Sequence, residues 1–281
     1  MPDIPVPDIP VPDIPGPAID VPPPLAGRTA LVTGGSRGIG RAIALRLAAD
    51  GAAVALTYRR DADAARRTVA EIVEAGGTGF AYRAPIDDPD AVPAMLDGVH
   101  ADLGPVDLLV SNAGTASRGT AVADTPDEEY LRLLRVHVLG PLTLVRALLP
   151  ELRAAPRADV VVISSVIVDQ MPAGGAPYAM AKAALEAAAR TLAAEERGAG
   201  VRVNIVAPGL VATDMGQRLV AATAGATIAE LDERYPFGRV ARAEDVAGVV
   251  AFLASADASY LTAQRIKVDG GGPPSPVAGS G

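Results

Sequence analysis

Short apolar runs alternate with longer stretches of helical periodicity from Thr29 to Val268. The apolar runs predict strands at 29–33, 53–57, 79–83, 107–111, 159–164, 201–206 and 264–268. The stretches between them predict helices at 38–49, 62–75, 90–103, 127–152, 178–200 and 243–255. Strands with two apolar faces that alternate with helices are typical of a parallel sheet covered on both sides. The pattern therefore predicts one α/β domain with a Rossmann-type, doubly wound, parallel seven-stranded sheet.

The two ends of the chain have a different composition. Pro2–Val6 reads Pro-Asp-Ile-Pro-Val, recurs at Pro7–Val11 and recurs again, less its last position, at Pro12–Pro15. Proline at this density blocks helices and central strands, so residues 1–24 are expected to form a disordered or extended arm. The domain is expected over 25–272 and a flexible tail over 273–281. Whether the Ile and Val positions of the arm dock on a neighbouring subunit or a partner stays open.

Composition narrows the classes of function. With 281 residues, 49% of them hydrophobic, the chain can bury one substantial core. It has no cysteine and only two histidines, His100 and His137, so we expect no disulfide and no metal site. A formal charge of −8 disfavours nucleic acid and anionic membranes as partners. Without a signal peptide or an apolar run of about 18 residues, a soluble cytoplasmic protein is expected.

A glycine-rich turn follows the first predicted strand and opens the first predicted helix. It reads Thr33-Gly34-Gly35-Ser36-Arg37-Gly38-Ile39-Gly40. Glycines let a ligand approach the backbone, and the free amides of a helix N-terminus attract phosphate. The turn therefore predicts a site for the pyrophosphate of a dinucleotide.

A candidate for acid–base chemistry lies further along the chain. Tyr178 and Lys182 are four residues apart on a predicted helix and share one face of it. A phenol has a pKa of about 10, and a cation about 4 Å away favours the phenolate by about 4 kcal/mol at an effective dielectric of about 20. We therefore expect Lys182 to lower the pKa of Tyr178 toward the working pH. Ser165 follows the apolar run Val160–Ile163 and is expected to face the same pocket.

The chain resembles the short-chain dehydrogenase/reductase family, and within it the 3-oxoacyl-[acyl-carrier-protein] reductase type. The resemblance rests on the order and spacing of the glycine turn, Ser165 and the Tyr178-x-x-x-Lys182 pair. The likeness covers about residues 25–272 and includes Ser111–Gly114, Pro208–Met215 and Val268–Gly271. It implies a ketoreductase in which Ser165 and Tyr178 bind the carbonyl oxygen of the substrate and Tyr178 protonates it. Lys182 would bind the nicotinamide ribose.

The resemblance also implies the cofactor contacts and favours NADP(H). Tyr58 stands where NAD-selective relatives carry a carboxylate, and Arg37 and Arg59 can each reach a 2′-phosphate. Asp61 is a counter-signal, and Pro85 stands where relatives carry an aspartate against the adenine. The expected cofactor-binding residues are Gly34, Ser36, Arg37, Gly38, Ile39, Gly40, Tyr58, Arg59, Ile86, Asp87, Asn112, Ala113, Gly114, Tyr178, Lys182, Pro208, Gly209, Val211 and Thr213.

His137 departs from the family pattern, which usually has an asparagine there that holds a water in the proton relay. An imidazole can hold that water or pass the proton itself, and it would add a titration near its ordinary pKa of about 6.5. The alternative is a packed, neutral histidine beside a relay built from backbone carbonyls. Both interpretations of His137, as a catalytic residue or as a packing residue, stay open here.

The expected substrate pocket is mostly aliphatic. By family position it is lined by Thr115, Val166, Ile167, Gln170, Leu210 and Met215. Residues 214–239 form either a lid over the substrate, as the resemblance implies, or a plain surface helix. This wall fits a hydrophobic ketone or a β-ketoacyl or polyketide-like substrate. Arg153, Arg157 and Arg197 are candidate contacts for an acyl-carrier protein that presents the substrate as a thioester.

The resemblance further implies a homotetramer, formed by pairing of the long helices. Two other functions stay open on the sequence alone. One is an enzyme of the same fold that catalyses an epimerisation or another non-reductive step. The other is a dinucleotide-binding scaffold without turnover.

Overall fold

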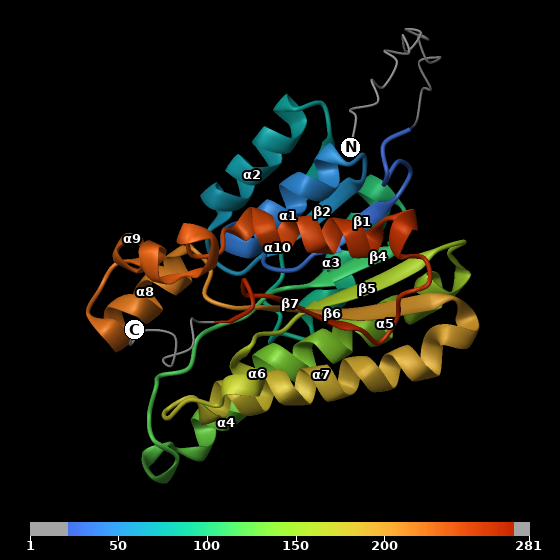
Figure 1. Ribbon diagram of the computed structural model, residues 1–281. Helices are drawn as coiled ribbons and strands as arrows, with labels where there is room; N and C mark the ends of the chain where they lie inside the picture. The colour runs from blue at the N-terminus through green and yellow to red at the C-terminus, as the bar shows by residue number, and fades with distance from the viewer. Residues whose placement is uncertain (1–21, 273–281) are drawn as a thin grey trace, which may run out of the picture.

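The computed structural model describes residues 22–272 and consists of one parallel sheet between two layers of helices (Figure 1). The strands are β1 (Thr29–Val32), β2 (Ala53–Tyr58), β3 (Thr78–Arg83), β4 (Leu108–Ser111), β5 (Ala158–Ile163), β6 (Val201–Pro208) and β7 (Arg265–Val268). Their order is β3-β2-β1-β4-β5-β6-β7, and every neighbouring pair is parallel. The predicted fold is confirmed, with strand ends displaced by at most two residues.

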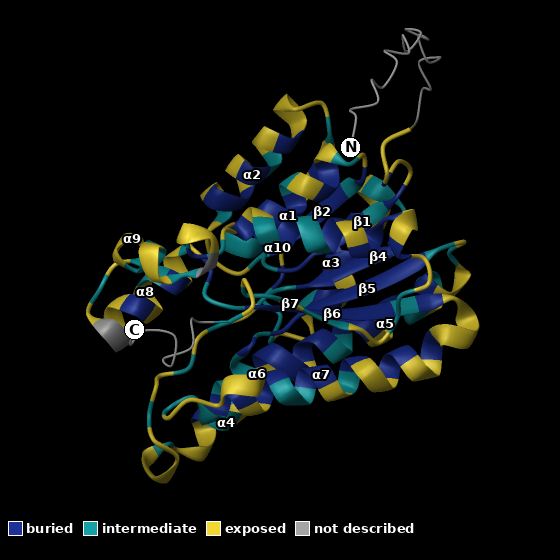
Figure 2. Cartoon of the chain, in the orientation of Figure 1, coloured by how far each residue is buried: buried dark blue, intermediate teal, exposed yellow. Residues whose placement is uncertain are grey.

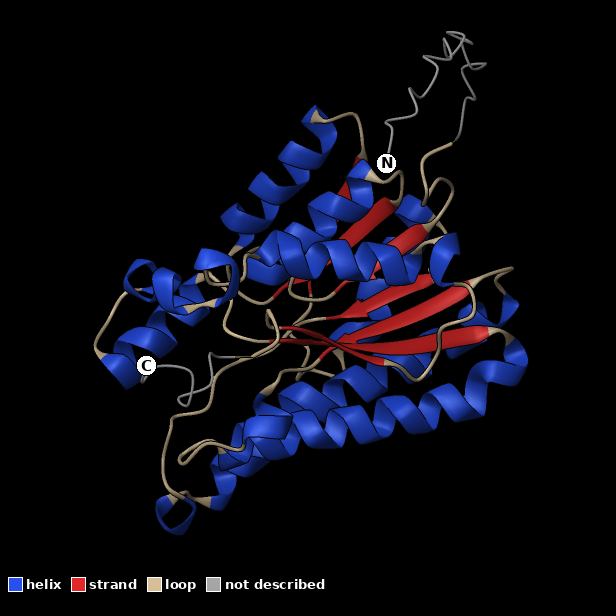
Figure 3. Ribbon diagram, in the orientation of Figure 1, coloured by secondary structure: helices blue, strands red, loops and turns tan. Residues whose placement is uncertain are grey.

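Helices cover both faces of the sheet (Figure 3). One face carries α1 (Gly38–Ala49), α2 (Ala62–Glu74) and α10 (Ala243–Ala254). The other carries α3 (Ala91–Leu103), α5 (Gly140–Ala154) and α7 (Ala176–Glu196). Because β1 and β4 are neighbours, the order of the strands reverses between them, and sheets of this kind bind ligands at the carboxyl side of that point.

The inner strands are mostly apolar because both of their faces are buried, whereas the edge strands β3 and β7 are largely half-buried or exposed (Figure 2). In β5, Val161 and Ile163 pack into the core under α1 and α10, whereas Val160 and Val162 pack into the core under α5 and α7. Successive side chains of a strand point to opposite faces, so one continuous apolar run serves two cores. This explains why the predicted strands stand out so clearly in the sequence.

A buried cluster of charges ties the amino edge of the sheet to the end of α10. The Asp159 carboxylate is 2% exposed and pairs with Arg28 at 3.0 Å, with Arg157 at 3.3 Å and with Arg202. Arg28 and Arg202 also donate to the carbonyls of Ala254 and Leu253, at 3.2 and 2.9 Å. Cations are favourable at the carboxyl end of a helix, so the three guanidinium groups satisfy both the carboxylate and the helix end.

The long helix predicted at 127–152 is interrupted by one wider turn. It consists of α4 (Asp127–Leu134), a π turn at Arg135–Leu139 and α5. Gly140 follows the π turn, and a Cβ on it would lie 2.0 Å from the carbonyl oxygen of Ile86. By length and composition alone the stretch Asp127–Ala154 is able to cross a membrane, but half of its most apolar window is buried inside the domain, as in the core helix of a globular protein.

Three short helices lie beyond the carboxyl ends of the strands. They are α6 (Ile167–Gln170), α8 (Asp214–Ala224) and α9 (Ile228–Leu231). The expected lid at 214–239 consists of α8, α9 and two 3₁₀ turns, Asp232–Arg234 and Pro236–Gly238, and it projects to one side of the sheet in Figure 1.

The predicted tail, 273–281, and the predicted arm, except for its residues 22–24, lie outside the described residues. Leu25 is fully buried and its amide donates to the Asp50 carbonyl at 2.8 Å. The Ala26 amide donates to the Pro23 carbonyl at 2.9 Å. Pro23 therefore already belongs to the first turn of the domain, slightly before the boundary expected from the sequence.

Candidate active site

The residues expected to react come together at the carboxyl end of β5. Ser165 lies two residues beyond the end of this strand, and Tyr178 and Lys182 lie on the first turns of α7. Lys182 is buried, and its ammonium donates to the carbonyl of Ile163, the last residue of β5, at 2.7 Å. The same nitrogen lies 5.7 Å from the centroid of the Tyr178 ring. The strand end, the serine and both α7 side chains thus form one cluster.

The pKa of Tyr178 differs from the sequence-based expectation. Burial raises it to about 12, and burial lowers the pKa of Lys182 to about 8, against the opposing charge of Glu186. Desolvation disfavours the charged form of both groups, and for the phenol it is the cause of the raised pKa. The expected lowering of the Tyr178 pKa is therefore wrong for this structure. Tyr178 holds its proton at neutral pH, which is the form that a proton donor needs.

His137 lies in the π turn and packs against Tyr178. The two rings meet edge to face, with centroids 5.2 Å apart and an interplanar angle of 86°. His137 is 1% exposed, and its Nε2 lies 2.9 Å from the Thr115 carbonyl oxygen and 3.3 Å from the Thr115 amide. Its Nδ1 is buried without a hydrogen-bond partner among the described residues. The shorter contact fits a neutral ring that donates from Nε2.

The charge state of His137 follows from this environment. Burial, reinforced by the nearby charge of Lys182, lowers the pKa of His137 to about 3. The titration near pH 6.5 expected for a histidine in the relay is therefore wrong for this structure, and the geometry favours the packed, neutral alternative. Gly114 makes room for the ring, because a Cβ there would lie 2.7 Å from Cε1 of His137.

The glycine turn lies at the switch point, next to the loop that follows β4. Asn112 donates from its side chain to the Thr33 and Gly34 carbonyls at 2.9 and 3.3 Å, and the Ala113 amide donates to the Thr33 hydroxyl at 3.0 Å. A Cβ on Gly40 would lie 2.2 Å from the Gly34 carbonyl oxygen. The structure thus brings together the expected contacts Gly34–Gly40 and Asn112–Gly114.

The first turn of α1 is suited to a phosphate. Arg37 caps α1 in an extended conformation without a side-chain hydrogen bond, and the first turn of the helix carries no acidic residue. Gly38 has φ of 56° and follows this cap, a conformation that glycine adopts without strain. The amides at this end of α1 and the positive end of its dipole are the groups that bind a pyrophosphate.

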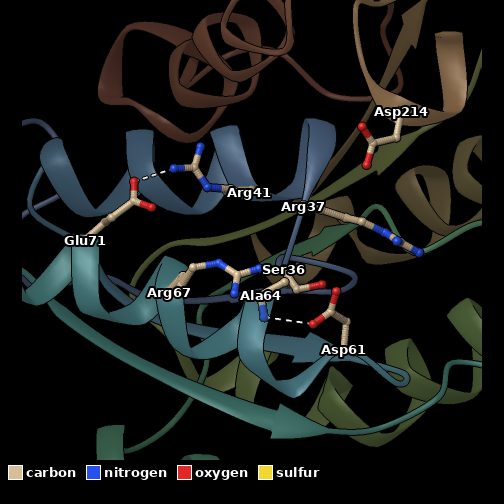
Figure 4. Close-up of a pocket in the computed structure, with 8 residues that line it drawn as sticks. All are labelled: Ser36, Arg37, Arg41, Asp61, Ala64, Arg67, Glu71 and Asp214. Atoms are coloured by element: carbon tan, nitrogen blue, oxygen red, sulfur yellow. Dashed lines mark hydrogen bonds and ion pairs between the residues drawn. The ribbon is translucent and has the colours of Figure 1, made fainter.

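A pocket of about 310 Å³ adjoins the glycine turn between α1 and α2 (Figure 4). Arg37 and Arg67 line it and form no ion pair with another residue of 22–272, whereas Arg41, also in the lining, pairs with Glu71. In Figure 4 the Arg67 guanidinium points toward Ser36. The other lining residues are Asp61, which caps α2 by accepting from the Ala64 amide at 2.9 Å, Ala64 itself and Asp214. Two unpaired guanidinium groups beside a serine hydroxyl fit a phosphate group.

This pocket adds two residues to the expected contacts, and the expected contact of Arg59 with a 2′-phosphate stays a prediction. Arg59 is not among its lining residues, and its guanidinium pairs with the Asp87 carboxylate at 3.6 Å. Arg41 and Arg67 were missed, because only the packing of α2 against α1 brings Arg67 to the glycine turn. The position of Arg67 within an amphipathic helix that follows a strand is the one sequence signal that could have drawn attention to it.

The predicted residues on the adenine side lie near the ends of β2 and β3. Tyr58 is the last residue of β2 and is half-buried, and Ile86 and Asp87 follow β3. The close approach of Ile86 to Gly140 fixes this loop against the π turn. The four residues Tyr58, Arg59, Ile86 and Asp87 therefore lie on one side of the glycine turn.

The segment after β6 closes the other side of the turn. The Pro208 carbonyl accepts from the Val166 amide, and the Gly209 amide donates to the Val268 carbonyl, both at 3.0 Å. Thr213 caps α8 by accepting from the Gly216 amide at 3.2 Å, and a Cβ on Gly38 would meet its side chain at 3.5 Å. The expected contacts Pro208, Gly209, Val211 and Thr213 thus lie beside Ile39 and its neighbours in the turn.

The residues expected to contact substrate lie around the cluster with different exposure. Thr115, Ile167 and Leu210 are half-buried, and Gln170 and Met215 are exposed. Val166 is 7% exposed and belongs more to the core than to a pocket wall. Five of the six side chains are therefore available at the surface beyond the strand ends.

The expected carrier-protein contacts lie at the opposite edge of the sheet. Arg153 ends α5, Arg157 precedes β5 and Arg197 follows α7, so all three lie at the amino ends of the strands. Arg153 binds the Glu196 carboxylate through two hydrogen bonds, at 2.8 and 2.6 Å, and Arg157 belongs to the Asp159 cluster. Arg153 and Arg157 serve the fold, and the position of all three arginines at the edge away from the catalytic cluster does not favour contact with a partner that presents substrate to the site.

Comparisons with known proteins agree with this geometry. A family model described as enoyl-(acyl carrier protein) reductase matches residues 34–272. The 3-oxoacyl-[acyl-carrier-protein] reductase FabG of Escherichia coli (strain K12) is 36% identical over 245 residues, which cover 87% of this chain and 97% of that protein. The chain is a member of the short-chain dehydrogenase/reductase family.

Solved structures of short-chain dehydrogenases share the fold. One from Burkholderia cenocepacia J2315, in complex with NADP, has a TM-score of 0.79 and 37% identity, and the match covers 88% of this chain and 98% of that one. A 7α-hydroxysteroid dehydrogenase complexed with NADH and 7-oxo glycochenodeoxycholic acid has a TM-score of 0.82 and 31% identity, with 90% and 96% covered. The two relatives hold different dinucleotides, so the choice between NADP and NAD depends on this chain's own residues.

Proposed function

We propose that this protein is an NADPH-dependent ketoreductase that reduces a hydrophobic ketone or a β-ketoacyl or polyketide-like substrate to the alcohol. The observation that carries the proposal is the meeting of Ser165, Tyr178 and Lys182 at the end of β5, with the glycine turn of β1 two strands away. NADP(H) is the proposed cofactor because the glycine cradle, the α1 N-terminus and the two unpaired arginines fit a dinucleotide that carries a 2′-phosphate.

Each residue of the cluster has a defined part in this proposal. Ser165 and Tyr178 hydrogen-bond the carbonyl oxygen of the substrate, and Tyr178 transfers its proton to that oxygen as the alcohol forms. When bound, the dinucleotide supplies the hydride that reduces the carbonyl carbon. Lys182, held by the Ile163 carbonyl, keeps a positive charge beside the phenol and favours the phenolate that remains after proton transfer.

The reaction is tested by following NADPH oxidation with a panel of cyclic ketones and acetoacetyl thioesters, with and without an acyl-carrier protein. We expect turnover that is lost in Tyr178→Phe, while NADPH binding, followed by its fluorescence, is kept. Binding without turnover on any substrate would contradict the proposal and favour a scaffold. Conversion of substrate without net NADPH consumption would favour an epimerase or another non-reductive enzyme.

The preference for NADPH is tested by removing the arginines of the pocket. Arg37→Met and Arg67→Met each remove one charge-assisted contact, worth about 1.5–3 kcal/mol, so KM for NADPH should rise about tenfold or more while KM for NADH stays the same. Arg46→Met is the matched control, since Arg46 lies in the last turn of α1, pairs with Asp50 and does not line the pocket. Equal effects of all three variants, or a wild-type preference for NADH, would refute this assignment.

We also propose a homotetramer, which the resemblance implies, and a location in the cytoplasm, which the composition of the chain favours. Light scattering measures the oligomeric state, and a monomer would contradict the proposal.

A further inference from the structure

A second group of charges lies directly behind the catalytic cluster and has no part in the proposed reaction. Its centre is Glu186 on α7, one helical turn after Lys182, with a side chain that is 3% exposed. The Glu186 carboxylate accepts from the Ser164 hydroxyl at 2.6 Å and from Nε of Arg265 at 2.7 Å. A buried carboxylate is costly unless it is paired, and Arg265 supplies the cation that is buried with Glu186.

Arg265 connects three elements through one guanidinium group. It lies on β7, the edge strand, and its side chain is 12% exposed. Besides Glu186, it binds the Asp169 carboxylate of α6 at 2.9 Å and donates to the main-chain carbonyl of Ser165 at 3.1 Å. A planar fork with five N–H donors can reach three partners in fixed directions, whereas a lysine ammonium cannot reproduce that geometry.

The partners of Arg265 flank the atoms that react. The carbonyl that it holds belongs to Ser165, whose hydroxyl also accepts from the Ile167 amide at 3.2 Å. Asp169 lies on the short helix that follows this serine, and Glu186 lies on the same helix as Tyr178 and Lys182. One side chain thus fixes the loop that carries the serine relative to the helix that carries the tyrosine and the lysine.

We propose that Arg265 is a positioning residue, which holds the Ser165 loop and α7 in the relative placement that carbonyl reduction requires. The proposal rests on the proposed ketoreductase function. It gives Arg265 no contact with substrate or dinucleotide. Misplacement of a reacting group by about 1 Å can cost about 100-fold in rate, so the loss of this link should act on the chemical step.

The test compares three variants of the full chain. Arg265→Met removes the link and keeps an apolar side chain of similar length. Arg265→Lys keeps a charge beside Glu186 but loses the fork, so it remains informative if the methionine variant does not fold. Arg190→Met is the matched control, because Arg190 also approaches Glu186, at 3.5 Å, but from the surface, with 52% of its side chain exposed.

The measurements are kcat and KM for the best ketone, the Kd of NADPH, the thermal midpoint and the kinetic isotope effect with NADPH deuterated at the transferred position. For Arg265→Met we expect a loss of kcat of about 10- to 100-fold, an unchanged Kd of NADPH and a larger isotope effect, because the chemical step becomes slower. Arg265→Lys should lie between this variant and the wild type. Arg190→Met should stay within about threefold of the wild-type kcat.

The outcomes separate this proposal from the proposed function. A folded Arg265→Met or Arg265→Lys variant with wild-type kcat overturns the positioning role alone. The positioning role is also overturned if kcat and the thermal midpoint both fall while the isotope effect stays the same. That result would show that the Arg265–Glu186 pair only stabilises the fold. Absence of ketone reduction by the wild type, measured in the same assay, overturns both proposals.

Discussion

Replacement of His137 by asparagine should change the pH dependence of stability by a predictable amount. The His137 ring is buried, and its pKa falls from about 6.5 to about 3. Below pH 6.5 the unfolded chain gains a proton on this residue that the folded chain does not accept until about pH 3. Because the folded-state pKa is the lower one, stability is fully present above pH 6.5 and is lost as the pH falls. The loss is about 1.4 kcal/mol per pH unit, or about 3 kcal/mol between pH 6.5 and 4.

The measurement is urea unfolding of the wild type and of His137→Asn at several pH values from 7 to 4, at one protein concentration. All other groups titrate in both proteins, so the difference between their unfolding free energies isolates His137. This difference should shift in favour of the asparagine variant by about 1.4 kcal/mol for each pH unit below 6.5. His100→Asn is the control, since the His100 side chain is 42% exposed and pairs with Glu151 at the surface.

A pH-independent difference would refute the neutral, buried state of His137 and would favour its role in the proton relay. The variant also tests function, because an asparagine amide, like the neutral ring, is a donor for the Thr115 carbonyl. If His137 only packs, kcat and its pH profile should be the same in the wild type and in His137→Asn. A changed pH profile would support the relay.

Three further changes have expected results. Asp159→Asn leaves buried arginines without their carboxylate, so the unfolding free energy measured with urea should fall by about 3–5 kcal/mol. Asp63→Asn, at an exposed ion pair, is the control and should cost less than about 1 kcal/mol. Equal losses would contradict a special role of the buried cluster. Gly140→Ala places a methyl group against the Ile86 carbonyl, so it should destabilise the fold by about 1–3 kcal/mol and weaken NADPH binding. Thermal unfolding with and without the dinucleotide measures both effects. Unchanged thermal midpoints would show that the π turn can move aside. Burial lowers the pKa of Lys182 to about 8, so its ammonium loses a proton as the pH rises and kcat/KM should fall above about pH 8. A kcat/KM that stays constant up to pH 10 would argue against a need for that charge.

The sequence predicts the fold and most of the site because both depend on local patterns. Apolar runs such as Val160–Ile163 are buried on both faces and cannot be mistaken for surface, and residues that follow a parallel strand must lie at its carboxyl end. Ser165, Asn112 and Pro208 are placed correctly for this reason. The direction of α5 and α7, which run back toward the amino edge, also follows from this topology and could have excluded Arg153 and Arg197 as contacts at the site.

The remaining features depend on contacts between distant parts of the chain. The partner of Arg59 is Asp87 on another strand end, and the approach of Arg67 to Ser36 depends on how α2 packs on α1. The pKa of Tyr178 depends on how deeply the phenol is buried and on where the Lys182 ammonium is held, and residue spacing contains neither quantity. Spacing indicates which groups can meet, and the packed structure decides which of two opposing effects is larger.

The buried arginines around Asp159 have a consequence for how this protein could change over evolutionary time. They fasten the ends of β1, β5, β6 and α10 at the edge of the sheet that faces away from the site. Helices α8 and α9 and the loops beside them take no part in these ion pairs and hydrogen bonds. Substitutions that alter substrate choice can therefore accumulate at the carboxyl edge of the sheet, because the arginine cluster at the amino edge keeps the fold stable. A laboratory search for new substrates should mutate residues 210–235 and leave the arginine cluster intact.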